Sequence, residues 1–474
     1  MKQVLCALLI SCLLITAAWS REEQEPVGPD FSGIDVLDLE TAQRIALQGN
    51  PGIVAAQARV EQARARVKQA VAAWWPSLDV TGTAARTRRS DVEFEIANHF
   101  PSVSGQSTDR TFDSSAAGLQ ATWVLFDGFY RSFKQEQTEF GEKSSAAARR
   151  DSQRLLVSAV AEAFLNAQLT ETKVKIAEAD KKFYAKQLLD ANNRYEVGTG
   201  SWGDVLNIKV QLNSARTSSM FGKREYEAAQ YGLAALLGVP DSIFPETVHL
   251  VELDKDFKPS EDFAKDVQGL IDDALAMRPD LRRLTMQVHE AEAATGQAKA
   301  AFWPRVQLGG AVNGAQQGDV ALTGDDFGNS LSISAAWNLF SGGADRARVF
   351  ETEQKRREVA YSRADLRNRV ASEVRQDIAL LAAAREQVRL QRESVDLVEQ
   401  NRELAQSEYE AGSASLVRLN EAQRDLTTTY GRLAQSLVGY HLARQRLLAA
   451  TGHNLEPFAD ALHEVQSAEG TATD

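Results

Sequence analysis

The sequence has few cysteines and a deficit of positive charge. Only 2 of its 474 residues are Cys, Cys6 and Cys12, so most of the chain can form neither a disulfide framework nor a cysteine metal site. Lys and Arg number 53 against 65 Asp and Glu, which gives a formal net charge of −12. Neutralising phosphates requires a basic face, so this balance argues against a nucleic-acid partner.

Catalytic and metal-binding motifs are also missing. The 6 His residues show no H-E-x-x-H or other metal-ligand spacing, and no nucleophile–base set stands out. The stretch from Gly198 to Gly203 fits G-x-G-x-x-G, but a dinucleotide site needs that motif between a strand and a helix, and here a long helix precedes it. We therefore expect no enzyme, no cofactor and no metal.

A continuous apolar run is present only near the start of the chain. Residues 1–20 are typical of a signal peptide, with Lys2, an apolar stretch up to Ile15, and small residues at Ala18 and Ser20. Cleavage after Ser20 would remove both cysteines. The alternative is a lipoprotein site in which Cys12 is acylated. Either way the sequence predicts an exported protein without a transmembrane helix, since no other run of about 18 apolar residues occurs.

Proline is absent from two long stretches. Of the 11 Pro residues, none lies in the 138 residues between Pro101 and Pro240 or in the 152 residues between Pro304 and Pro457. Because proline breaks helix interiors at a cost of ~3 kcal/mol, these stretches favour very long helices. Apolar residues recurring in steps of three and four between positions 370 and 409 agree. A helix over residues 129–195 would be about 100 Å long, which no compact domain needs.

The sequence repeats itself. The motif Y-E-x-G at Tyr195 recurs at Tyr409, and W-x-L-F-x-G at Trp123 recurs at Trp337, both at an offset of 214. The Trp-Pro pair that begins at Trp75 recurs at an offset of 228. The difference of 14 residues places one net insertion or deletion between these landmarks, and loops tolerate such changes.

Alternating apolar and polar residues predict two strands in each repeat. Each run is near 10 residues, the length that a tilted strand needs to cross a membrane. Aromatic residues at one end of each strand suit a membrane–water interface. The alternative is a soluble hairpin that packs these rings in a core. The interface aromatics are Trp75, Trp123, Phe126, Trp303, Trp337 and Phe340.

These patterns together predict a mainly α fold with a β-barrel contribution, built from two tandem repeats of helix, strand, strand, long helix, turn and helix. Four strands cannot close a barrel alone, and an open edge in lipid leaves unpaired backbone groups, so other copies of the chain must complete it. The predicted segments are a signal peptide (1–20), repeat 1 (37–240, strands about 77–85 and 115–126), an inter-repeat equatorial linker (241–264), repeat 2 (265–452, strands about 304–313 and 330–340) and a C-terminal tail (453–474).

The ordered duplication of these motifs resembles the TolC family of outer-membrane efflux proteins. The resemblance covers roughly residues 39–452. It implies a homotrimer in which three chains share one twelve-stranded transmembrane barrel, continued by an α-helical coiled-coil tunnel across the periplasm. It also implies a periplasmic adaptor and an inner-membrane transporter as partners, in a tripartite efflux pump or a type I secretion system. On the residues, Leu331, Ile333 and Leu339 would face outer-membrane lipid.

In the family, the two helix turns at the periplasmic tip form the gate and the adaptor contact. Two departures follow from the family pattern: Ala414 stands where the best-known member has a gate arginine, and Arg418 and Glu421 stand where it has two constricting aspartates. We hypothesise that Asp204, with Glu421, pairs with Arg418 to hold the closed state. The alternative is that these are solvated turn charges worth little. The residues implied for the tip are Tyr195, Gly198, Asp204, Tyr409, Gly412, Arg418 and Glu421.

Two further features leave alternatives open. The loop that carries Arg86, Arg88 and Arg89 and continues to Ser115 either binds anionic lipopolysaccharide or binds nothing. As a whole, the chain is either a passive outer-membrane channel or a periplasmic coiled-coil adaptor or spacer without membrane strands. Four alternating strands with interface aromatics favour the channel.

Overall fold

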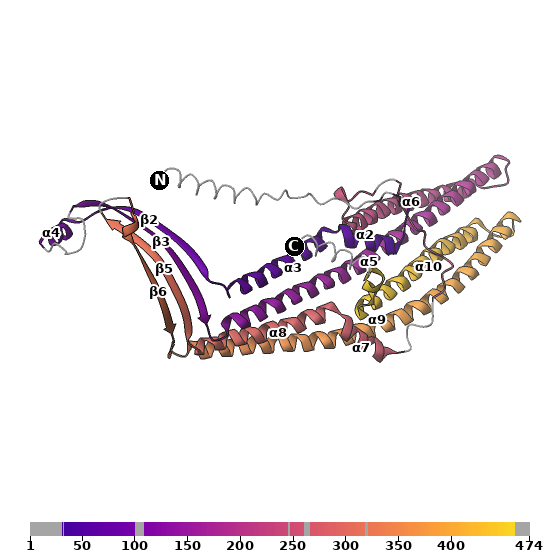
Figure 1. Cartoon of the computed structure of the whole chain (residues 1–474). Helices are drawn as coiled ribbons and strands as arrows, with labels where there is room; N and C mark the ends of the chain where they lie inside the picture. The colour runs from indigo at the N-terminus through magenta and orange to yellow at the C-terminus, as the bar shows by residue number, and fades with distance from the viewer. Residues whose placement is uncertain are drawn as a thin grey trace. The chain divides into compact units, whose positions relative to one another are not determined.

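A computed structural model describes residues 31, 33–99, 109–244, 247–259, 266–317 and 321–459. The expected signal peptide, both cysteines and the end of the C-terminal tail lie outside the described residues. Within the described part, the chain is mainly helical, and Figure 1 shows long helices and one curved sheet. No described helix is long and apolar enough to cross a bilayer.

The two repeats contain matching elements. The first holds β1 (Val36–Leu37), α2 (Leu39–Gly49), α3 (Pro51–Ala72), β2 (Ser77–Arg88), α4 (Asp91–His99), β3 (Thr111–Phe126), α5 (Tyr130–Glu196), α6 (Trp202–Leu237) and the 3₁₀ turn η1 (Pro240–Ser242). The second holds β4 (His249–Leu250), α7 (Val267–Met277), α8 (Pro279–Lys299), η3 (Ala300–Phe302), β5 (Arg305–Gln317), η4 (Gly324–Asp326), β6 (Phe327–Ala336), α9 (Ala344–Glu410), α10 (Leu416–Thr451) and η5 (His453–Phe458).

Helix lengths follow the sequence repeat. The long helices α5 and α9 each have 67 residues, and α6 and α10 each have 36. Both pairs keep the offset of 214. Glycine ends α6 and α10 in the same left-handed conformation, with φ +79° at Gly238 and φ +86° at Gly452. The tandem repeat in the sequence is therefore a repeat of structure.

Four strands form one antiparallel sheet in the order β2-β3-β5-β6. The central pair, β3 and β5, joins the two repeats, with Ala117 opposite Gly314. Strands β2 and β6 each pair on one side only, so both edges of the sheet are open within the described residues. In β6, Leu331 and Ile333 alternate with serines, which places apolar and polar side chains on opposite faces.

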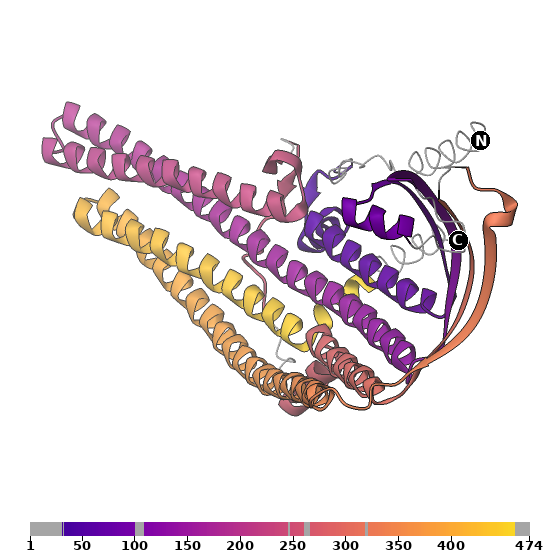
Figure 2. The same cartoon turned by 90° about the vertical axis from the view of Figure 1, so that its left-hand side faces the viewer.

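The chain divides into two compact units, and the helices α5 and α9 run through both. Of the described residues, the hairpin unit comprises those within Met1–Ala56, Arg150–Arg278 and Val370–Asp474, and the sheet unit comprises those within Gln57–Arg149 and Pro279–Arg369. In the hairpin unit, α5 turns back into α6 and α9 turns back into α10 (Figure 2).

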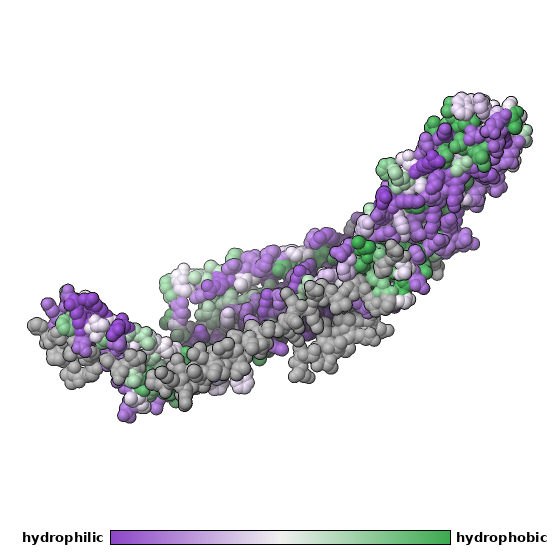
Figure 3. All heavy atoms as spheres, turned by 90° about the horizontal axis from the view of Figure 1, so that it is seen from above, coloured by the Kyte–Doolittle hydropathy of each residue, from purple (hydrophilic) through white to green (hydrophobic). Residues whose placement is uncertain are grey.

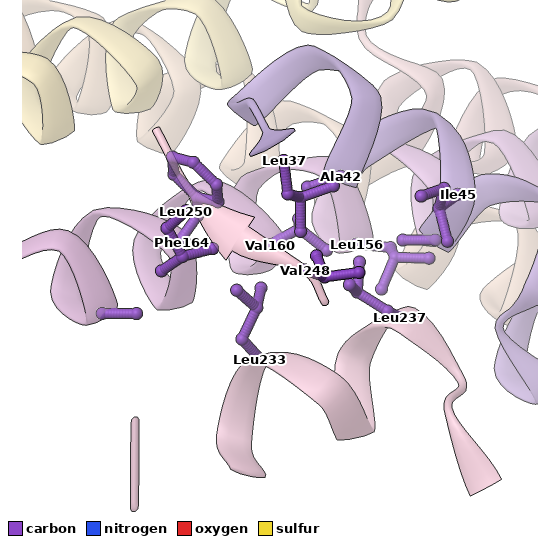
Figure 4. Close-up of a cluster of buried hydrophobic side chains, with 12 residues drawn as sticks. Leu37, Ala42, Ile45, Leu156, Val160, Phe164, Leu233, Leu237, Val248 and Leu250 are labelled. Carbon is purple, nitrogen blue, oxygen red and sulfur yellow. The ribbon is translucent and has the colours of Figure 1, made fainter. Parts of the chain in front are cut away.

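The core of the hairpin unit lies where the short strands β1 and β4 pair in parallel. Leu37 and Leu250 from these strands meet side chains from α2, α5 and α6, as Figure 4 shows. Phe164 of α5 and Leu237 of α6 are almost completely buried there. The inter-repeat linker is thus tied to the first repeat by packing, and Lys175 Nζ also lies 2.7 Å from Glu252 Oε1.

The structure differs from the expected elements in four places. Strands β2, β3 and β5 are longer than expected, and β2 runs to Arg88, so Arg86 and Arg88 lie in a strand and not in the outer loop. The outer loop of repeat 1 contains α4, which a capping box begins: Glu93 N donates to Ser90 Oγ, and Ser90 N donates to Glu93 Oε2. Strand β6 ends at Ala336, before Trp337 and Phe340. The C-terminal segment begins as a packed turn, in which Phe458 is buried against Leu47.

Candidate functional site

Two regions hold the residues that the sequence singled out: the strand bases, where the sheet meets the helices of the sheet unit, and the hairpin tips, where α5 turns into α6 and α9 turns into α10. At the strand bases, the two repeats use the same hydrogen bond. Trp123 Nε1 donates to Trp74 O at 2.9 Å, and Trp337 Nε1 donates to Phe302 O at 3.1 Å. Each indole thus joins the end of one strand to the segment that precedes its partner strand.

The other strand-base aromatics are largely exposed within one chain. Trp75, Trp303 and Phe340 show more than half of their surface to solvent. Phe126 is only partly exposed and meets the ring of Trp303 edge-on at 6.5 Å between centroids. Exposed rings at the ends of strands suit a membrane–water interface better than a soluble core.

A buried ion pair at the strand base was missed by the sequence analysis. Arg131 Nε donates to Asp127 Oδ2 at 2.9 Å, and the guanidinium lies 4.5 Å from the centre of the Trp74 ring. The spacing of four residues at the start of a helix is the signal that could have identified it. In repeat 2 the equivalent positions are Ser341 and Asp345, which share a hydrogen bond instead.

The hairpin tips are built alike. Gly198 and Gly412 end the long helices with φ +78° and φ +74°. Ser201 then caps α6 by accepting from Asp204 N, and Ser415 caps α10 by accepting from Arg418 N. The sequence repeat thus places Asp204 and Arg418 at the same position of the first helical turn.

Aromatic side chains pack the two tips together. Tyr409 of α9 lies against a buried cluster that joins both hairpins and includes Val205 and Leu416. The Arg194 guanidinium lies 4.7 Å from the centre of the Tyr409 ring, and Tyr195 meets Trp202 at 5.2 Å. Burial raises the pKa of Tyr409, although the charge of Arg194 opposes this shift.

The charged tip residues are arranged differently from the hypothesis. Arg418 Nε lies 3.1 Å from Glu408 Oε2, a partner that the sequence analysis did not name. Within one chain this ion pair stands in place of the proposed pairing with Asp204 or Glu421. The macrodipole of α10 accounts for the Arg418–Glu408 contact. A cation in the first turn of a helix lies near the positive end of its dipole, which is unfavourable unless a carboxylate neutralises it. Glu421 is exposed on the following turn.

Above the tips, polar contacts join the helices of the hairpin unit. Asp180 Oδ1 of α5 accepts from Gln423 Nε2 at 2.9 Å and from Thr427 Oγ1 at 3.1 Å, both on α10. Glu178 accepts from Ser219 Oγ at 2.7 Å and pairs with Lys223 Nζ at 2.8 Å, both on α6. Hydrogen bonds from lysines and Ser219 lower the pKa of Glu178 to about 2.

The described residues offer no centre for chemistry. A groove of about 1000 Å³ in the hairpin unit is lined by α5, α9, α10 and the linker, and its lining includes acidic and basic residues such as Asp180, Glu399 and Arg402. No group of three or more His, Cys, Asp or Glu in the described part could hold a metal ion. The class of protein that this arrangement defines is a helical channel component that carries membrane strands.

Known proteins of this architecture match along most of the chain. The family model "Outer membrane efflux protein" matches residues 43–239 and 270–453. Among curated relatives, the probable efflux pump outer membrane protein TtgC of Pseudomonas putida is 26% identical over 447 residues, which cover 89% of this chain and 86% of TtgC. The alkaline protease secretion protein AprF of Pseudomonas aeruginosa is 24% identical over 414 residues, which cover 87% of this chain and 83% of AprF.

Solved structures show the same fold. The CmeC outer membrane channel of Campylobacter jejuni superposes with a TM-score of 0.75 at 16% identity, covering 92% of this chain and 90% of that one. The open-state MtrE outer membrane channel of Neisseria gonorrhoeae gives a TM-score of 0.71 at 19% identity. The match covers 90% of this chain and 97% of the MtrE chain.

The chain belongs to the outer membrane efflux protein family. The resemblance to the TolC family that the sequence indicates is therefore confirmed. The protein is a non-enzymatic outer-membrane channel of efflux or secretion systems, and it extends into the periplasm. This assignment replaces the alternative of a periplasmic adaptor or spacer without membrane strands.

Proposed function

We propose that three copies of this chain form a passive conduit that spans the outer membrane and the periplasm. The observation that carries this proposal is the open sheet, whose edge strands β2 and β6 each lack a second partner within the described residues. Backbone groups that lipid leaves unpaired cost several kcal/mol each, so a membrane sheet must close on itself. Pairing β6 of one copy with β2 of the next continues the antiparallel order.

The number of copies follows from the width of the barrel. Two copies would give eight strands, and side chains fill the interior of a barrel of about that size. Three copies give twelve strands, which is wide enough to leave a lumen. The proposed barrel would place the strand-base aromatics at one level, near the periplasmic surface of the membrane.

We further propose that the hairpin tips form the gate and contact a periplasmic adaptor, which links the channel to an inner-membrane transporter. The residues proposed for these roles are Tyr195, Gly198, Asp204, Tyr409, Gly412, Arg418 and Glu421. Support comes from their position at the turns and from the Arg418–Glu408 ion pair, which holds α9 and α10 together at the tip. Names of relatives such as TtgC, a probable efflux pump component, agree with a pump partner.

Single-channel conductance in planar bilayers tests the conduit and its gate. Arg418→Ala removes the tip ion pair, and an exposed pair contributes about 0.5–1 kcal/mol. With three copies, the open population is expected to rise on the order of tenfold. Arg424→Ala, also exposed on α10, is the matched control and should leave the conductance unchanged. Equal conductance of Arg418→Ala and the native channel would contradict the gate, and a chain that never conducts would contradict the conduit.

A further inference from the structure

Strand β2 carries two exposed arginines, Arg86 and Arg88, at the end that lies away from the helices. Side chains alternate between the two sides of a strand, so these arginines share a side with the apolar Leu78 and Val80. Both apolar side chains are also exposed within one chain, at 67% and 80%. We call this side of the sheet the apolar side.

Strand pairing extends the apolar side across the whole sheet. Residues directly opposite each other on neighbouring strands share a side. One row therefore holds only apolar residues and glycine, whereas most of the next row is polar. The first row consists of Leu78, Ala121, Gly310 and Leu331, and the second of Ser77, Thr122, Gly309 and Ser332. Since a wide barrel turns its apolar residues to lipid and its polar residues to the lumen, the apolar side is the one that meets lipid in the proposed barrel.

The length of β2 sets the two arginines at the border of the membrane. Arg86 is eight residues beyond Leu78 and Arg88 is ten. At about 3.3 Å per residue and a tilt of about 40°, these steps cross about 20 Å and about 25 Å of the membrane. The apolar band of an outer-membrane barrel is about 25 Å tall. The basic side chains thus begin where the band ends, at the membrane face opposite the strand bases.

Two further arginines of this region lie on the other side of the sheet. Arg89 N donates to Arg110 O at 2.8 Å, which continues the β2–β3 ladder by one step and sets the two residues opposite each other. The Arg89 guanidinium lies 4.7 Å from the centre of the Phe112 ring, and Arg110 pairs with Asp91 of α4. These two arginines are therefore engaged within the chain and turned away from lipid.

The arginines of the apolar side retain donors for a ligand. Arg86 Nε lies 3.1 Å from Asp113 Oδ1, yet the Arg86 side chain is 77% exposed. A guanidinium has five N–H donors, so one contact through Nε leaves its terminal nitrogens available. Arg88 lies opposite Thr111 and has no ion-pair partner among the described residues. The two arginines are about 7 Å apart along the strand, close enough to reach one phosphate group.

Unpaired polar atoms lie beside the arginines on the same side. Ser115 of β3 is opposite both Ala84 of β2 and Gln316 of β5, one row nearer the apolar band. Ser115 Oγ and Gln316 Oε1 are buried and have no hydrogen-bond partner in the described part of the chain. Because buried polar atoms are nearly always hydrogen-bonded, this row can accept and donate bonds to a polar headgroup.

The second repeat has no equivalent pair of arginines. At the offset of 228 that relates the Trp-Pro pairs, Arg86 and Arg88 correspond to Gly314 and Gln316 of β5. Figure 3 shows hydrophilic residues gathered around α4 and the strand ends beside it, at the left of the view. The basic pair is thus specific to β2, and its surroundings are polar, as a headgroup region requires.

We propose that Arg86 and Arg88 bind a phosphate group of a lipid in the outer leaflet of the outer membrane, the lipid A part of lipopolysaccharide. The arginines donate to the phosphate oxygens while the acyl chains lie along Leu78 and Val80. Arginine suits this role because its planar guanidinium bonds phosphate in a bidentate manner, and basic residues at a membrane surface attract anionic lipids. The inference rests on the proposed barrel for the side that meets lipid.

Native mass spectrometry of the full chain in detergent tests this site. The protein is titrated with lipid A that carries both phosphates, and bound lipid is counted against its free concentration. We expect Arg86→Gln/Arg88→Gln to raise the dissociation constant about tenfold to thirtyfold. Both side chains are exposed, so the exchange should leave the fold intact. The control Arg89→Gln/Arg110→Gln removes the same charge from the other side of the sheet and should leave the dissociation constant within about twofold of the native value.

Two further ligands identify the source of the phosphate. Lipid A stripped of both phosphates should bind the native protein no better than intact lipid A binds Arg86→Gln/Arg88→Gln. Inorganic phosphate at millimolar concentration should not displace intact lipid A. Equal binding of the stripped lipid, equal losses in the two double variants, or displacement by inorganic phosphate would overturn the lipid site. A monomeric mass of the lipid-free particle would instead contradict the proposed trimer.

Discussion

The residues just before α3 and α8 are different side chains that donate a hydrogen bond to equivalent backbone carbonyls. Asn50 Nδ2 donates to Leu236 O at 2.8 Å, and Arg278 Nη1 donates to Ala450 O at 3.2 Å. Leu236 and Ala450 are equivalent carbonyls in the last turns of α6 and α10. Arg278 is buried and also pairs with Glu373 at 2.7 Å. Since each residue precedes a proline that opens the next helix, each joins a helix junction to a helix end.

Replacing Asn50 by alanine and replacing Arg278 by alanine should lower the stability of the protein by different amounts. Asn50→Ala removes the bond to Leu236 O and the cap on Gly52 N, which we expect to cost about 1–2 kcal/mol. Arg278→Ala leaves a buried carbonyl unpaired and breaks an ion pair, for an expected cost of about 2–4 kcal/mol. Melting temperatures in detergent would measure both.

An exchange between the repeats provides the control. Arg278→Asn restores the amide that repeat 1 uses but not the bond to Glu373, so its stability should lie between those of the native chain and Arg278→Ala. If Arg278→Asn is no better than Arg278→Ala, the two positions are not equivalent.

At the scale of elements, side-chain contacts link α5 to the helix α6 that turns back beside it. Glu178 shows this best, since its carboxylate bonds to Ser219 and Lys223 on α6 and to Lys181 on its own helix. These bonds favour the ionised form and hold the pKa of Glu178 at about 2, below its ordinary value of 4.5.

The link through Glu178 should weaken in acid. Because its folded pKa is lowered, the stabilisation is complete above pH about 4.5 and disappears as the pH falls toward about 2. Glu178→Gln should therefore lower the melting temperature at pH 7, and the difference from the native protein should shrink between pH 4.5 and 2. The control Glu225→Gln changes an exposed carboxylate on α6. A difference for Glu178→Gln that stays constant with pH would rule out the lowered pKa.

The elements that could be predicted from the sequence are those set by long local patterns. Proline-free stretches and motif offsets predict the paired long helices, and alternation predicts the strands. The Arg418–Glu408 pair could not be found, because it depends on how the turn brings residue 408 back to residue 418. Helix α4 was overlooked although Ser90 and Glu93 form a readable capping box. Strand β6 ends at Ala336, because its partner strand β5 begins at Arg305, directly opposite Ala336.

At the scale of the whole molecule, one chain leaves two kinds of surface unsatisfied. Within the described residues, the sheet has open edges at β2 and β6, and the hairpin unit exposes large apolar side chains on α6 and α9, among them Phe221 and Leu397. The edge strands of a sheet need hydrogen-bond partners, and exposed apolar side chains are stabilised when they are buried. In the proposed trimer, head-to-tail association of identical copies would supply partners for both sheet edges, because each copy offers one edge to each of its two neighbours.

The measurement that tests this account most directly is the mass of the purified particle in detergent, by native mass spectrometry. Each full chain has a mass of 52.0 kDa, and we expect a particle of three copies with no monomer at working concentrations. A folded, conducting particle of one chain would contradict the account, because the sheet edges would then have closed without neighbours.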